Sequence, residues 1–200
     1  LGRWSGSLFG LLILLFVLFL FLPGALRPPG DRRGWAFVGG GSSFGGAAWM
    51  LASGAGGSWP ANTRRVLLAA GRALVIPALL LFGVEQILHP TLLPGVPLRK
   101  DMPAWIPARV LIDYVTGAAL LVTGGSVLLK RNTRVVTGWV GAWLLLLVLV
   151  IYGPVMILAL ARPETAVQVE GINYFADTLL FAGVILVLSE ASPRAKDLPR

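Results

Sequence analysis

The chain has 200 residues, of which 56% are apolar and 13% are charged, and it contains no cysteine. Soluble domains carry roughly 45–50% apolar and about 25% charged residues, so this composition excludes an ordinary soluble domain. Without cysteine, the chain itself carries no disulfide, iron–sulfur cluster or dithiol redox centre. The net charge of +8 does not indicate nucleic-acid binding, because the Arg and Lys residues form short clusters between apolar runs, where they set topology.

Long uncharged runs determine the predicted fold class. They cover residues 8–22, 66–88, 110–129, 135–161 and 172–188. Most of them reach the roughly 17–25 residues that a helix needs to cross a bilayer. The runs are continuous and do not alternate with period two, which excludes a strand barrel. We therefore predict an all-α, polytopic transmembrane helical bundle of about six spans, in contact with the lipid bilayer.

Residues 1–60 are expected to hold two spans and a linker. The first span covers residues 6–23 and ends at Pro23-Gly24; it resembles a signal peptide, but we expect a retained span. The second covers Trp35–Ala52 and is rich in glycine, which lowers helix propensity and also permits close helix packing in lipid. The alternative for this second segment is a re-entrant one.

Residues 61–190 are expected to form a four-helix membrane core, followed by a polar tail at 191–200. The predicted spans cover residues 65–88, 110–129, 135–160 and 172–189. Pro77 lies in the middle of the first of these, where a proline removes one backbone hydrogen bond and usually bends the helix.

The connection at residues 89–109 is rich in proline and is not one long helix. Its Trp105 and Ile106 predict a segment that lies on the membrane surface. More of the 17 Lys and Arg residues fall on the side of the two termini than on the other side, so both termini are predicted to be cytoplasmic.

Polar residues are expected to converge on one membrane face. Antiparallel alternation of the spans alone places them within roughly 10 Å of the outer interface. Ionisable side chains at membrane depth usually face the bundle interior, pair with one another or line a wet cavity. The candidate ligand-binding residues are Glu85, His89, Asp113, Tyr114, Tyr152, Asn173 and Asp177.

Three interpretations of these residues stay open. They are solvated or paired structural groups, a pocket for a small ligand or a quinone headgroup, or a metal or proton-relay site. No set of nucleophile, base and orienting group is present, nor a phosphate loop or a specific metal-ligand spacing, so we predict no catalytic residue and no metal ligand. His89, the single histidine, cannot supply two axial haem ligands.

Residues 65–190 resemble the DoxX-like family of small bacterial integral membrane proteins, which has a four-helix core. The resemblance rests on residues 83–90, on Asp113 followed by Gly117 and Gly124, on the sequence Pro-Gly-Val-Pro at 94–97, and on Trp105-Ile106-Pro107. Asp113 stands where that family more often has Glu, and the first two spans lie outside the shared core.

The resemblance implies a bacterial inner-membrane protein connected to redox systems. DoxX-like proteins include a subunit of a thiosulfate:quinone oxidoreductase and a membrane partner of oxidative-stress enzymes. We therefore expect a non-catalytic accessory subunit of a membrane oxidoreductase or electron-transfer complex, with other membrane subunits as partners. The cofactor is left open between none and a quinone, without covalent or iron–sulfur groups. The alternatives are a self-standing small-molecule binder or transporter, and a quinone-linked oxidoreductase.

Overall fold

The computed structural model describes residues 2–27, 32–54, 59–96 and 100–192. The described chain is a helical bundle, which confirms the predicted fold class. Its helices are α1 (Gly2–Phe16), η1 (Val17–Phe21), α2 (Leu22–Ala25), α3 (Arg32–Gly54), α4 (Ala61–Leu88), α5 (Arg109–Leu128), α6 (Thr133–Leu147), η2 (Val148–Tyr152), α7 (Gly153–Leu160) and α8 (Thr165–Glu190). The predicted tail beyond residue 192 lies outside the described residues.

Five helical segments in the described chain are long and apolar enough to cross a membrane. They are Trp4–Ala25, Ala61–Leu88, Arg109–Leu128, Thr133–Leu160 and Thr165–Glu190. Large apolar side chains such as Leu8, Phe19, Trp139 and Leu149 point outward and are more than half exposed. Apolar surface of this extent on several helices suits contact with lipid. The chain is a multi-pass membrane protein.

The predicted glycine-rich span is also a helix, but one of a different kind. α3 is uninterrupted over 23 residues, about 34 Å at the usual helical rise, but it is not among the five segments that are long and apolar enough to cross a membrane. It packs against α1, α4 and α8. α3 mainly faces other helices, and about half of its residues are buried. Its side chains are small and only moderately apolar, because a helix in such a position does not need the large apolar side chains that suit lipid contact.

Glycines set the distance between α3 and α4. A Cβ atom added at Gly46 would lie 2.6 Å from the carbonyl oxygen of Gly71, and one at Gly71 would lie 2.5 Å from that of Gly46. Real Cβ atoms do not come this close, so only glycine fits at both positions. Gly83 of α4 and Gly117 of α5 make a similar reciprocal contact at 3.0 Å. Small residues of this kind allow close packing of membrane helices.

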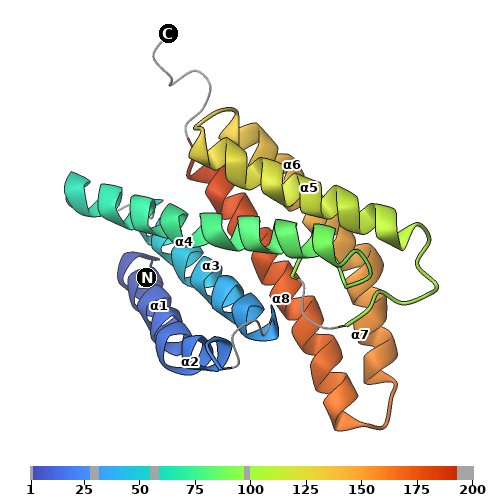
Figure 1. The fold of residues 1–200 in the computed structure, drawn as a ribbon. Coiled ribbons are helices and arrows are strands. Elements are labelled where there is room, and N and C mark those ends of the chain that lie inside the picture. The colour runs from blue at the N-terminus through green and yellow to red at the C-terminus, as the bar shows by residue number, and fades with distance from the viewer. Residues whose placement is uncertain (1, 28–31, 55–58, 97–99, 193–200) are drawn as a thin grey trace.

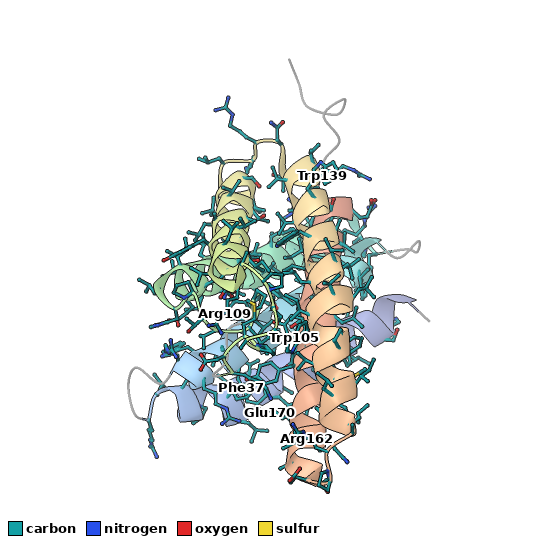
Figure 2. The ribbon with its side chains drawn as sticks, turned by 90° about the vertical axis from the view of Figure 1, so that its right-hand side faces the viewer. Phe37, Trp105, Arg109, Trp139, Arg162 and Glu170 are labelled. Atoms are coloured by element: carbon teal, nitrogen blue, oxygen red, sulfur yellow. The ribbon has the colours of Figure 1, made fainter. Side chains whose placement is uncertain are left out.

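The helices α3, α4, α5, α6 and α8 surround one core, and α1 lies outside it against α3 (Figure 1). The rings of Phe82 and Phe181 meet edge to face at a centroid distance of 5.1 Å in this core, and both are fully buried. Figure 2 shows Trp139 and Arg162 near opposite ends of the bundle, with the connection that carries Trp105 between them.

Two of the spans contain a π-helical turn shortly before a proline. The turn Val17–Phe21 precedes Pro23, and the turn Val148–Tyr152 precedes Pro154. Proline cannot donate to the carbonyl four residues earlier and its ring clashes with that carbonyl, so a wider turn relieves the conflict. The first span therefore continues past the predicted stop at Pro23 as far as Ala25.

Part of the proline-rich connection packs into the bundle, and its position on the membrane surface stays a prediction. Leu93, Val96, Met102 and Ile106 are buried and belong to the hydrophobic core, while Trp105 is 52% exposed. The connection folds back because its apolar side chains fill the outer end of the bundle. We call its described residues 91–96 and 100–106 the cap.

Candidate functional site: a polar cluster under the cap

A hydrogen-bonded chain joins α4, α5 and the cap. Gln86 Nε2 donates to Asp113 Oδ1 at 2.8 Å, and Gln86 Oε1 accepts from the backbone N–H of Gly95 at 3.1 Å. Gln86 and Asp113 have no exposed surface. A single amide side chain thus serves two buried partners. Buried polar groups need such partners, since an unpaired one costs free energy.

Two tyrosines hold the cap from the other side. The hydroxyl of Tyr152 donates to the carbonyl oxygen of Pro94, and the hydroxyl of Tyr174 accepts from the backbone N–H of Lys100 at 3.1 Å. Lys100 Nζ also forms an ion pair with Glu170 at 2.8 Å and lies 5.7 Å from the centre of the Tyr174 ring. Residues of η2 and α8 therefore fix both arms of the cap.

The two arms of the cap also bind each other. The N–H of Leu93 donates to the carbonyl of Lys100 at 2.9 Å, and the N–H of Met102 donates to that of Thr91 at 2.7 Å. These bonds form around the isolated pairing of Leu92 with Asp101. The cap is therefore an ordered element and not a free tether.

Two buried oxygen atoms beneath the cap have no hydrogen-bond partner among the described residues. They are Oδ2 of Asp113 and Oγ1 of Thr178. Asp113 Oδ2 is a strong acceptor, and a hydroxyl such as that of Thr178 both donates and accepts. We call Gln86, Asp113, Tyr152, Tyr174 and Thr178 the polar cluster; its members lie on α4, α5, η2 and α8.

Glu85 and His89 form a separate group at the outer end of α4. His89 Nε2 lies 3.8 Å from Glu85 Oε2, as the spacing of four residues on a helix predicts. Arg32, at the start of α3, lies 3.6 Å from the same oxygen. The side chain of Glu85 is 19% exposed and that of His89 is 42% exposed, so this group sits at the rim and not under the cap.

The remaining candidates from the sequence are less buried. Tyr114 is 45% exposed, Asn173 is also exposed, and Asp177 is half-buried. The candidate Asn173 does not face the interior of the bundle. The inward face instead carries Tyr174 and Thr178, which share the buried side with Phe181 and Ile185.

Sequence reasoning missed Gln86, which connects the other parts of the site. A usable signal was present, because Gln86 continues the helical spacing of Val75, Leu79 and Phe82, all of which have no exposed surface. Thr178 continues the corresponding pattern on α8. A polar residue on an otherwise apolar inward face of a membrane helix is, like an ionisable one, an indicator of a site.

The polar cluster offers hydrogen-bond donors and acceptors. Among the described residues, no group of three or more His, Cys, Asp or Glu side chains is arranged to hold a metal ion. The groups that can bind a ligand are the carboxyl oxygen of Asp113 and the hydroxyls of the cluster, at the edge of an apolar core. Such a set recognises a small polar headgroup with both donor and acceptor atoms.

No protein-family model, curated protein or solved structure matches this chain.

Proposed function

We propose that the protein is a non-catalytic accessory subunit of a membrane oxidoreductase or electron-transfer complex, in which the polar cluster binds a quinone headgroup. In this proposal the protein resides in a bacterial inner membrane with both termini in the cytoplasm. The redox context comes from the DoxX-like resemblance. The observation that supports a ligand at this place is the pair of buried oxygens, Asp113 Oδ2 and Thr178 Oγ1, which lack a standard hydrogen bond among the described residues and lie beneath a hydrogen-bonded cap.

The donor and acceptor set of the cluster suits such a headgroup. A quinol hydroxyl needs an acceptor, which Asp113 Oδ2 can supply, and a quinone carbonyl needs a donor, which the Thr178 hydroxyl can supply. Phe82 and Phe181 supply apolar ring surface in the adjacent core. A bound quinone would carry electrons for partner proteins, while the residues of this chain bind and orient it.

A headgroup would reach the polar cluster when the cap moves aside. Its bonds to Gln86 and Tyr152 each join a side chain to a single backbone group of the cap. Hydrogen bonds of this kind contribute roughly 0.5–1.5 kcal/mol each. Opening the cap therefore costs only a few such bonds together with the exposure of its apolar side chains.

Purification of the tagged chain from its native membranes in mild detergent tests the proposal. We expect a stoichiometric redox protein to co-purify, and quinone to be present in an organic extract of the complex. An Asp113→Asn variant should retain the partner and lose most of the quinone. A chain that migrates alone and yields no quinone contradicts the proposal. A chain that migrates alone but retains quinone is a self-standing binder, and contradicts the accessory role.

A further inference from the structure

A second cavity system lies at the opposite end of the bundle from the cap. One cavity, of about 1270 Å³, lies among the start of α1, the end of α3, the start of α4 and the end of α8. A second, of about 570 Å³, continues between α1, α3 and α8. Both are lined by Ser5, Gly6, Leu51 and Val187, so together they form one groove. We call it the α1–α8 groove.

The deep part of the groove is apolar and borders on lipid. Phe9, Phe44 and Leu180 line it, with Gly183 on its α8 side. Leu51 and Leu180 are 58% and 55% exposed, so the groove has apolar rims on the outer surface of a membrane protein. A molecule already in the bilayer is therefore able to enter it sideways.

The mouth of the groove is cationic. Arg64 and Arg65 line it, and both are exposed. Among the described residues that line the mouth, the acidic one is Glu190, which is held by Arg134 through bonds of 2.8 and 3.0 Å. Arg72, one helical turn beyond the mouth residue Leu68, does not line the groove and donates from Nη2 to the carbonyl oxygen of Ala191 at 2.5 Å. Arg64 Nε donates to the carbonyl oxygen of Ser53 at 3.2 Å. The mouth therefore offers the positive charge of Arg64 and Arg65.

The length of the groove matches one leaflet of a bilayer. Along α8 it runs from Glu190 at the mouth to Leu179 at its deep end. Eleven residues of helix correspond to roughly 16 Å, about half of a hydrocarbon core of about 30 Å. A ligand with this shape has an anionic head at the membrane surface and a chain that reaches the bilayer centre.

We propose that the α1–α8 groove is a binding site for one anionic phospholipid of the leaflet that meets Arg64 and Arg65. The phosphate lies at the basic mouth and an acyl chain occupies the apolar part between α1 and α8. Basic pockets between membrane helices favour anionic headgroups in this way. This site is separate from the polar cluster and does not depend on the proposed quinone role.

Substitutions at two glycines provide a variant that blocks the groove and a matched control that does not. A Cβ atom at Gly183 or at Gly125 meets no atom within 4 Å, so neither position clashes at the first side-chain atom. A Gly183→Phe side chain extends from a lining residue into the groove, whereas Gly125 lies on α5 and does not line it. The charge variant is Arg65→Gln, and its control is Arg131→Gln in the exposed turn after α5.

The measurement is native mass spectrometry of the full chain, transferred from nanodiscs of phosphatidylcholine with and without phosphatidylglycerol. We expect one retained phosphatidylglycerol per chain, no comparable retention of phosphatidylcholine, loss of the adduct in Gly183→Phe, and retention in Gly125→Phe. Removal of one Arg near a membrane surface costs about 1 kcal/mol, so Arg65→Gln should weaken retention about fivefold and Arg131→Gln should not.

Equal retention of the two lipids overturns the proposal, as does an unchanged adduct in both Gly183→Phe and Arg65→Gln. A dimer without bound lipid also overturns it, because a second copy then covers the groove. If Gly183→Phe does not fold, Arg65→Gln decides the question alone, because it alters only an exposed side chain.

Discussion

Gln86 on α4 donates a hydrogen bond of 2.8 Å to Asp113 on α5, and both side chains are completely buried. The same amide accepts from the N–H of Gly95, so one side chain couples two membrane helices to the cap. This coupling places the cap over the carboxyl group of Asp113, and it makes the stability of the cap sensitive to changes in the polar cluster.

Replacement of Gln86 by leucine should destabilise the protein by roughly 3 kcal/mol. Two buried groups, Asp113 Oδ1 and the N–H of Gly95, lose their partner, and each such loss costs about 1–3 kcal/mol. Unfolding by SDS in mixed micelles measures the change in free energy. The control is Ile87→Leu, at an exposed neighbouring position, which should stay within about 0.5 kcal/mol of wild type. Equal stability of the two variants would show that the amide does not hold the cap.

Removal of the Tyr152 hydroxyl should loosen the cap without disturbing the helices. Tyr152→Phe keeps the buried ring and loses the bond to the Pro94 carbonyl, at a cost of about 1 kcal/mol. Hydrogen exchange at the amides of Leu93 and Gly95 should become faster, while exchange in the middle of α8 stays unchanged. Tyr114→Phe, at an exposed position on α5, should leave the exchange of the cap as in wild type.

The effects of Gln86→Leu and Tyr152→Phe should not add. Both residues bind adjacent parts of the same short segment, at Gly95 and Pro94, so loss of one weakens the bond made by the other. A double-mutant cycle measured by SDS unfolding should give a coupling free energy of about 0.5–2 kcal/mol. Simple additivity would mean that the two bonds act independently and that the cap is not one unit.

The contact between Gly46 and Gly71 should tolerate no added methyl group. Gly71→Ala places a Cβ atom 2.5 Å from a backbone oxygen, which forces α3 and α4 apart and should cost several kcal/mol. Gly125→Ala has no neighbouring atom within 4 Å and should instead stabilise α5 by up to about 1 kcal/mol. Thermal unfolding of both variants in the same detergent checks the opposite signs.

The pairing of Glu85 with Arg32 and His89 at the outer end of α4 should contribute little to the free energy of unfolding. Its distances to Arg32 and His89 are 3.6 and 3.8 Å, beyond hydrogen-bond range, and its partners are partly exposed. Ion pairs of this kind contribute about 0–1 kcal/mol. Glu85→Gln should therefore shift the SDS unfolding free energy by less than about 1 kcal/mol. A loss as large as that of Gln86→Leu would place Glu85 in the polar cluster after all.

Hydropathy and spacing were sufficient to predict the helical bundle and its antiparallel order. The apolar runs are long enough to define the spans, and alternation alone brings the outer ends of α4, α5 and α8 to one face. The glycine-rich α3 was harder to interpret, because a helix buried among other helices loses the apolar signal that lipid contact imposes. That α3 is one continuous helix of 23 residues depends on its contacts with the neighbouring helices, which hydropathy alone does not predict.

Which residues make up the site was harder to predict, because it depends on local structure that leaves only a weak signal in the sequence. The π turn that ends at the fully buried Tyr152 shifts the register of the span, which periodicity based on 3.6 residues per turn does not capture. The inward direction of the cap depends on tertiary bonds from Gln86 and Tyr174. Of the charged candidates, Asp113 lies inside, whereas Glu85 and His89 lie at the rim. Neutral Gln86 and Thr178, which were not predicted, also lie inside.

Binding of a short-chain quinol to the purified protein tests the central claim most directly. Asp113→Asn keeps the Oδ1 acceptor for Gln86 but replaces the free oxygen Oδ2 with an amide that cannot accept, and loss of such a bond costs about 1.5–3 kcal/mol. Wild type and Tyr114→Phe should bind with the same affinity, and Asp113→Asn should bind at least about tenfold more weakly. Equal affinity of all three proteins, or no binding to any of them, would contradict a quinone site in the polar cluster.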